Sequence, residues 1–203
     1  MESEITRLPL RERNRQRIYQ RIVSAATELF RTSGFNQVTM DAIADKAEVS
    51  RGTLFNYFPT KEALLIPFAS ELYKHSVQPE ILSYLQTQPR TLQVLRFLFL
   101  RIHEHILTLP HIDRALHLEF FQHTSATKDC STEIGFLETL TTILQYGQQR
   151  GEVRNDIPLE RMAHYVGVLY IALLYSLVKQ GTPTNYTEEV DILLAFLHNA
   201  LMP

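Results

Sequence analysis

The stretch VTMDAIADKAEVSRGTLFNYFPTKEALL, residues 38–65, decides the fold. Thr39 offers a side-chain oxygen to the free amides of the next turn, which predicts a short helix that begins there and ends near Ala47. Ser50 is a second capping residue. The helix that it opens must end before Pro59, because a residue that precedes proline disfavours helical dihedral angles. Two short helices joined by a tight turn have the dimensions of a helix-turn-helix.

The second of these helices has two unlike sides. At about 100° per residue, its bulky apolar side chains fall on the side that is expected to face the core. These side chains are Leu54, Phe55 and Phe58. The opposite side has small and hydrogen-bonding residues, namely Gly52, Thr53 and Asn56, with Tyr57 at the flank. Such a helix can enter a DNA major groove, although a plain three-helix bundle with a polar outer face fits the same spacing.

Each residue of the polar side suits one kind of DNA contact. Asn56 can form two hydrogen bonds to an adenine edge, the Thr53 methyl group can touch a thymine methyl, and Gly52 lets the backbone come close. Polar groups that suit phosphate contacts belong to Ser50, Tyr57 and Lys61. Arg51 points towards the core side in an ideal helix, but it lies in the first turn, and we expect its long side chain to reach DNA.

Residues 38–65 closely resemble the DNA-binding signature of the TetR/AcrR family of regulators. The preceding IVSAATELFRTSGFNQ, residues 22–37, resembles that family's first helix and its exit. The resemblance covers roughly residues 15–65 and consists of a run of matching positions at fixed spacing. It implies a DNA-binding regulator with no catalytic residue and no cofactor, and repression is the usual mode of action in this family.

The resemblance also implies roles for single residues. The segment from Ser50 to Tyr57 corresponds to the recognition helix, and Thr39 corresponds to a position that commonly touches phosphate. Phe55 departs from the tyrosine that the family most often has, so any polar role there is lost. The predicted DNA-binding residues are Thr39, Ser50, Arg51, Gly52, Thr53, Asn56, Tyr57 and Lys61.

The rest of the chain has helical periodicity from end to end, which predicts an all-α fold. A first helix is predicted by apolar residues at three- and four-residue steps, with Gly34 as a left-handed cap: Ile18, Ile22, Ala25, Ala26 and Leu29. Later helix breaks are expected at Pro79, Pro89, Pro110, Gly151, Pro158 and Gly181. We expect residues 1–62 to form the DNA-binding domain with a basic arm, and residues 63–203 to form a helical ligand-binding and dimerisation domain.

The charges are distributed unevenly between these two parts. Residues 1–62 contain ten basic and eight acidic residues, whereas residues 63–203 contain ten and fourteen. Six arginines crowd the start of the chain: Arg7, Arg11, Arg13, Arg15, Arg17 and Arg21. They predict either an arm that reaches DNA phosphates or a solvated, frayed terminus. No apolar run follows these first charges, so we expect a cytoplasmic protein without a signal peptide or a membrane anchor.

The segment from Val166 to Val178 is apolar on every side of a helix, but it is too short to span a membrane. The final helix, near residues 187–201, is similarly apolar. Paired across a two-fold axis, these helices would form a four-helix interface, and the resemblance implies the same homodimer. A charge at the centre of the helix that contains Val166 to Val178, as in Leu174→Arg, is expected either to split the dimer or to unfold the chain. A large monomer core is the alternative.

The middle region, residues 92–150, is where a small apolar or aromatic effector is expected to bind. The candidate pocket residues are Phe97, Ile102, Phe120, Phe121 and Tyr146. Histidines also gather in this region: His103, His105, His111, His117 and His123. His103 and His105 project about 200° apart on a helix, so we expect no metal site. The single cysteine, Cys130, allows neither a disulfide within the chain nor a thiolate metal cluster.

Three classes of function fit a helical protein of this composition, namely a DNA-binding regulator, an enzyme that acts on an apolar substrate, and an adaptor without a nucleic-acid role. The sequence has no glycine-rich phosphate loop and no G-x-S-x-G motif, so nothing specific favours an enzyme. Retention on DNA at low salt distinguishes a regulator from an adaptor. The helix-turn-helix favours the regulator.

Overall fold

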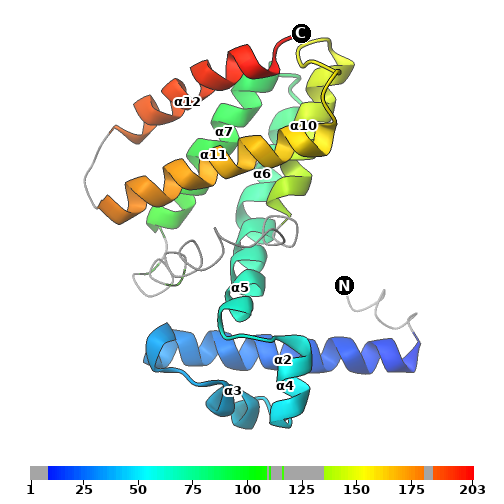
Figure 1. Ribbon diagram of the computed structural model, residues 1–203, viewed down its shortest axis with the longest axis vertical. Helices are drawn as coiled ribbons and strands as arrows, with labels where there is room; N and C mark the ends of the chain where they lie inside the picture. The colour runs from blue at the N-terminus through cyan, green and yellow to red at the C-terminus, as the bar shows by residue number, and fades with distance from the viewer. Residues whose placement is uncertain (1–8, 109, 111–115, 117–134, 181–184) are drawn as a thin grey trace. The chain divides into compact units, whose positions relative to one another are not determined.

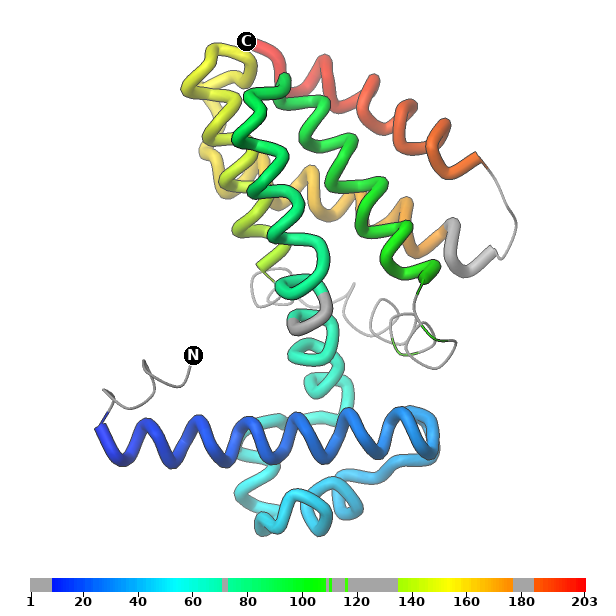
Figure 2. Tube along the Cα trace, turned by 180° about the vertical axis from the view of Figure 1, so that it is seen from behind, coloured from blue at the N-terminus to red at the C-terminus, as the bar shows by residue number. Residues whose placement is uncertain are grey.

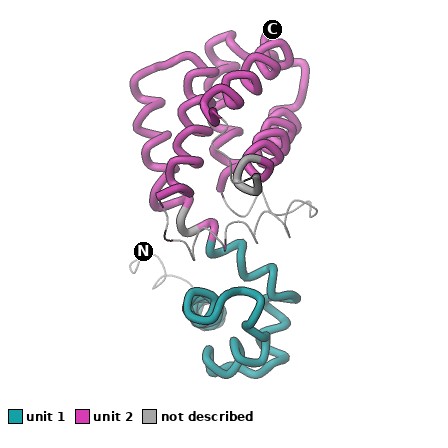
Figure 3. The backbone as a smooth tube through the Cα atoms, turned by 90° about the vertical axis from the view of Figure 1, so that its left-hand side faces the viewer, with its two compact units in different colours: residues 1–68 teal, residues 69–203 magenta. Residues whose placement is uncertain are grey.

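The computed structural model describes residues 9–108, 110, 116, 135–180 and 185–203, and all regular structure within these residues is helical (Figure 1). The α-helices in chain order are α2 (Leu10–Ser33), α3 (Met40–Lys46), α4 (Arg51–Tyr57), α5 (Leu65–Leu72), α6 (Gln78–Leu85), α7 (Thr91–Thr108), α10 (Phe136–Gln149), α11 (Leu159–Gln180) and α12 (Tyr186–Leu201). The prediction of an all-α fold is confirmed. The chain divides into two compact units, residues 1–68 and 69–203 (Figure 3), whereas the sequence predicts a boundary at 62–63.

Helix α2 provides the surface on which the rest of the first unit packs. Its buried side chains recur at three- and four-residue steps: Ile22, Ala25, Ala26 and Phe30. The helix ends at Gly34, whose φ of 80° is open to glycine but costly for other residues. At its other end, α2 begins at Leu10, so Arg11 and its neighbours lie on a helix. Of the two alternatives that the sequence leaves open, a frayed terminus does not fit these helical residues, the contact with DNA phosphates stays a prediction, and Arg7 lies outside the described part.

Helices α3 and α4 have the boundaries that their capping residues predict. The Thr39 side chain accepts a hydrogen bond from the Ala42 amide at 3.2 Å, and the Ser50 side chain accepts one from the Thr53 amide at 3.0 Å. Each bond satisfies a backbone donor that the first turn of a helix leaves free. Both helices also bury apolar residues, chiefly Ile43, Ala44 and Leu54.

The chain does not break at Pro79 as predicted. Helix α5 passes into a π-helical segment, Tyr73–Val77, and α6 follows directly with Pro79 in its first turn. Proline lacks an amide hydrogen, and its ring crowds the carbonyl one turn earlier. A wider turn ahead of the proline relieves this clash, so the helical path continues where the sequence predicts an end.

In the second unit, α7, α10, α11 and α12 pack around a common apolar core (Figures 1 and 2). The Phe99 ring stacks on Tyr170 with centroids 4.1 Å apart. The hydroxyl groups of Tyr170 and Tyr186 donate to the Phe99 carbonyl at 3.0 and 2.9 Å. Because these buried hydroxyls are hydrogen-bonded, their burial costs little.

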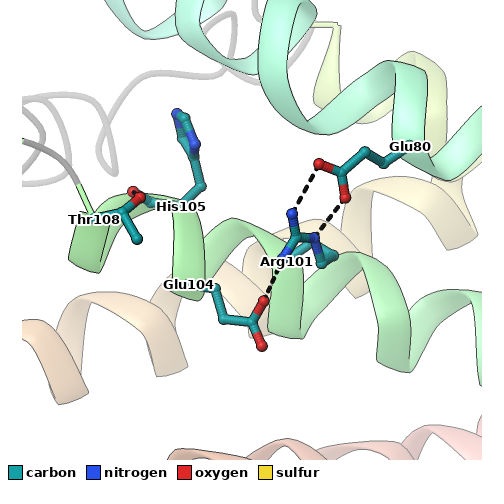
Figure 4. A network of polar contacts seen from close by, with 5 residues as sticks. All are labelled: Glu80, Arg101, Glu104, His105 and Thr108. Carbon is teal, nitrogen blue, oxygen red and sulfur yellow. Dashed lines mark hydrogen bonds and ion pairs between the residues drawn. The ribbon is translucent and has the colours of Figure 1, made fainter.

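Charged side chains connect α6 to α7 at the surface of this unit (Figure 4). The guanidinium of Arg101 donates to both carboxylate oxygens of Glu80, at 2.6 and 2.7 Å, and also to Glu104. The hydrogen bond from Arg101 holds the pKa of the Glu80 carboxyl below its usual range. This pair is partly exposed, so its main effect is to fix the geometry of the two helices and not to add much stability.

Of the histidines that gather in the middle of the sequence, where we expect no metal site, the described part of the chain contains His103 and His105. His103 lies flat against Tyr186, with ring centroids 3.5 Å apart, and no group of three or more metal-ligating side chains comes together among the described residues. Several predicted residues lie outside the described part, namely His111, His117, His123, Phe120, Phe121 and Cys130. In the described part, no helix combines the length and hydropathy needed to cross a membrane.

Candidate nucleic-acid interface

Helix α4 is buried along one side and exposed along the other. Leu54 and Phe58 face the core, where Phe58 packs against the ring of Tyr19 at 5.3 Å. On the opposite side, Gly52 and Asn56 are exposed. The Thr53 hydroxyl forms a hydrogen bond with Ser50 at 2.8 Å. The amide group of Asn56 and the open backbone at Gly52 are therefore available to a DNA base edge.

Phe55 does not face the core as predicted. Its side chain is 37% exposed, and the guanidinium of Arg51 lies over its ring at 5.5 Å. Phe55 lies about 100° around the helix from the buried Leu54, at the edge of the buried side. The exposed ring adds a large apolar group to the exposed side of α4, of the kind that can contact thymine methyl groups.

Arg51, which the sequence places ambiguously, extends over the surface of the unit. Its guanidinium forms an ion pair with Asp41 at 3.3 Å, near the start of α3. Both side chains are largely exposed, so this pair adds little stability and can exchange for a stronger partner. A DNA phosphate or guanine edge would be such a partner, so a contact between Arg51 and DNA stays a prediction.

Two of the predicted phosphate contacts form hydrogen bonds within the unit. The Tyr57 hydroxyl donates to the Arg15 carbonyl of α2 at 3.2 Å. The Lys61 ammonium donates to the carbonyls of Phe35 and Val38, at 2.8 and 3.1 Å. Both residues are half-buried. Their contact with DNA stays a prediction, and each would have to exchange or share its present partner to make it.

The arginines near the start of α2 form a regular helical array. Arg11 and Arg15 lie one turn apart, and the Arg15 backbone also accepts the hydrogen bond from Tyr57. Removing residues 1–14, the obvious truncation, would therefore delete the first turn of a helix along with the charges. Side-chain substitution is the cleaner test of these arginines.

We expect the double substitution of Arg11→Ala and Arg15→Ala to lower the salt dependence of DNA binding. Alanine preserves the helix, so only the charges change. Each lost phosphate contact should reduce the slope of log affinity against log salt by about 0.9. The measurement is a salt titration of DNA affinity by fluorescence anisotropy. A slope equal to that of the wild type would mean that neither arginine touches phosphate.

Comparison with known proteins places this site in a recognised group. The model of the family "Bacterial regulatory proteins, tetR family" matches residues 22–66, which contain α3 and α4. The crystal structure of FadR from Thermus thermophilus, a TetR-family transcriptional repressor in complex with lauroyl-CoA, is 30% identical in sequence. It aligns with a TM-score of 0.73 over 88% of this chain and 92% of that one.

Two curated relatives from Bacillus subtilis (strain 168) also match over most of their length. The fatty acid metabolism regulator protein is 29% identical over 150 residues, which cover 70% of this chain and 75% of that protein. The HTH-type transcriptional regulator YdeS is 24% identical over 181 residues, which cover 87% and 86%. The similarity therefore extends beyond the helix-turn-helix into the second unit.

Proposed function

We propose, because the chain belongs to the TetR family of bacterial regulatory proteins, that this helix-turn-helix transcriptional regulator is a repressor that an effector releases from DNA. The family consists of DNA-binding regulators and not of enzymes. The observation that carries the proposal is α4, which exposes Gly52, Asn56 and Phe55 on one side and buries Leu54 on the other. This function places the protein in the cytoplasm, with its DNA.

The proposed operator is a near-palindrome. Two recognition helices related by a two-fold axis meet successive major-groove faces about 34–36 Å apart, or a multiple of this distance. Footprinting on DNA upstream of the protein's own gene tests the proposal. Protection of a two-fold symmetric site supports it, and failure to protect any DNA at low salt contradicts it.

We expect Asn56→Ala to relax sequence preference while the fold stays intact. Asn56 is exposed, so its loss leaves no cavity, but a lost pair of hydrogen bonds to a base costs about 1–3 kcal/mol of discrimination. The measurement is the ratio of affinities for the specific operator and a scrambled one. If the ratio in the purified variant equalled that of the wild type, Asn56 would not read a base.

The exposed apolar side of α11 and α12 supports the proposed homodimer. Val168 is 53% exposed on α11, and Ile192 and Phe196 are 58% and 65% exposed on α12. Tyr165 and Leu169 extend the same exposed side of α11. Because these residues are not used by the core of their own unit, a second copy of the chain is the natural cover, and a monomer core does not account for them.

We propose a long-chain acyl-CoA thioester as the effector. The support is the 30% identity, over most of both chains, to a repressor that binds lauroyl-CoA. The contacts of two predicted pocket residues indicate that they pack within the fold. Phe97 packs against Tyr84 with ring centroids 4.5 Å apart, and the Tyr146 hydroxyl donates to the Pro89 carbonyl at 2.7 Å. Ile102 is half-buried on α7 and stays a candidate.

Tyr73 is a further candidate that the sequence does not indicate. It lies in the π-helical segment and packs edge-on against Phe136, with centroids 6.1 Å apart. Its hydroxyl is buried and lacks a hydrogen bond of normal geometry. The Thr139 hydroxyl, which donates to the Gly135 carbonyl at 3.0 Å, interacts with the Tyr73 hydroxyl, but no hydrogen bond of normal geometry joins the two. A buried hydroxyl without a good partner suits a polar atom of a ligand, such as the thioester carbonyl.

We expect Tyr73→Phe to require at least about tenfold more lauroyl-CoA for release from DNA, with an unchanged or higher melting temperature. The substitution removes a hydroxyl that forms no hydrogen bond of normal geometry in the free protein, so the loss should fall mainly on the bound state. The measurement pairs effector titration of the DNA complex with thermal unfolding. Tyr186→Phe is the control, because its hydroxyl donates to Phe99, so stability should fall while the response to effector persists. An unchanged response in Tyr73→Phe would remove Tyr73 from the effector site.

A further inference from the structure

Arg21 binds the end of α3 and the turn that follows it. Its Nη2 atom donates to the Ala47 carbonyl at 2.5 Å, to the Glu48 carbonyl at 3.0 Å and to the Glu48 carboxylate at 3.1 Å. The two carbonyls belong to Ala47, the C-cap residue of α3, and to the residue after it, at the end of the helix where backbone acceptors lack partners within the helix. A cation at this position is also favoured by the helix dipole. The sequence places Arg21 among the arginines that can reach DNA phosphates. In the structure its guanidinium is instead hydrogen-bonded to three acceptors within the first unit.

The turn that Arg21 holds is strained. Glu48 has a φ of 50°, in the left-handed region that favours glycine. A residue other than glycine or asparagine persists in that region only where its surroundings fix it. Arg21 contacts both the carbonyl and the carboxylate of Glu48, and α4 begins at Arg51, shortly after this turn. A change in the Glu48 dihedral angles would therefore rotate the whole recognition helix.

Lys61 plays the equivalent part ahead of α3. Its ammonium donates to the carbonyls of Phe35 and Val38, and it lies 4.3 Å from the centre of the Phe35 ring. Val38 directly precedes Thr39, the capping residue of α3. Lys61 follows α4 in the sequence, so it joins the exit of the recognition helix to the entrance of α3.

We infer that Arg21 and Lys61 are positioning residues for DNA recognition, which close the two ends of α3 through backbone carbonyls and do not contact phosphate. The inference rests on the proposed DNA-binding function. To reach a phosphate, Arg21 would leave three acceptors, and Lys61 would leave two acceptors and an aromatic ring. These hydrogen bonds keep α4 in the position and orientation that base recognition requires.

The first test separates positioning from phosphate contact by the salt dependence of binding. Arg21→Ala and Lys61→Ala should each lower the ratio of specific to scrambled operator affinity about tenfold, with the salt slope of the wild type retained. A phosphate ligand behaves in the opposite way, because its loss weakens all sequences alike and lowers the slope by about 0.9. Lys46→Ala is the matched control, since the Lys46 ammonium on α3 pairs with the Glu28 carboxylate at 2.8 Å and should leave the ratio unchanged.

The second test uses the strained turn itself. Glycine adopts a φ of 50° without strain, so Glu48→Gly should restore most of the operator discrimination that Arg21→Ala loses. The same rescue should appear in the melting temperature without DNA, which makes this test independent of the proposed function. The double variant also keeps the unit folded if Arg21→Ala alone does not. Additive losses in the double variant, or a lowered salt slope in either single variant with unchanged melting, would overturn the inference.

Discussion

Phe196→Arg is expected to yield a folded monomer that has lost at least about a hundredfold in operator affinity. Phe196 is 65% exposed in the single chain, so a charged side chain there leaves the core of its own unit intact. In a two-fold dimer the substitution occurs twice, and each unpaired charge taken from water opposes association by about 3–5 kcal/mol. Since about 1.4 kcal/mol is a factor of ten, the dimer should not form at micromolar concentration.

The loss of DNA affinity follows from the loss of the second recognition helix. When two α4 helices belong to one dimer, the second binds at a high effective concentration, which raises affinity by about 10²–10⁴ without any new contact. The measurement is mass in solution beside operator affinity. Leu82→Arg is the control, because Leu82 is an exposed leucine on α6 and its substitution should leave a dimer with normal binding. A Phe196→Arg protein that remains dimeric would exclude this surface of α12 from the interface.

Leu174→Arg is expected to unfold the second unit and not to split a folded dimer. The sequence alone allows either outcome, because every side of α11 is apolar. In the structure Leu174 is fully buried, on the side of α11 that faces the core of its own unit. A charge at this position is desolvated without a partner in every state that preserves the fold. The expected loss exceeds about 4–5 kcal/mol, a large part of the total stability of a domain.

The two sides of α11 provide the matched control for this prediction. Leu169→Arg places the same charge on the same helix, but Leu169 is exposed in the single chain. It should therefore yield a helical protein with a cooperative unfolding transition, whereas Leu174→Arg should lack that transition. Circular dichroism with urea unfolding distinguishes the two variants. A Leu174→Arg protein that unfolds cooperatively at the wild-type urea concentration would contradict the burial of Leu174.

The sequence by itself determined the elements whose causes are local. Thr39 and Ser50 cap helices because a side-chain oxygen and an amide two or three residues later are within reach whatever the rest of the chain does. Pro59 ends α4 for an equally local steric reason. The all-α fold follows from periodicity over many residues, and the helix-turn-helix follows from the fixed spacing of these signals.

Only the tertiary structure decided how far the packing around each helix extends. Periodicity places Phe55 and Leu174 on apolar sides of their helices, but it does not say that Phe55 is partly exposed or that Leu174 faces inwards. Pro79 is a similar case, since a π-helical turn lets the chain continue where local rules predict a break. In each case the outcome depends on neighbours that are distant in sequence.

The long basic side chains are the clearest example of this division. Sequence indicates the positive charge of Arg21 and Lys61, and charge alone favours DNA phosphate as the partner. The folded unit instead brings backbone carbonyls from 26 and 27 residues away to Arg21, and from 26 and 23 residues away to Lys61. A flexible cation binds whichever acceptors the fold places within its reach, and their positions exist only after α2, α3 and α4 have packed together.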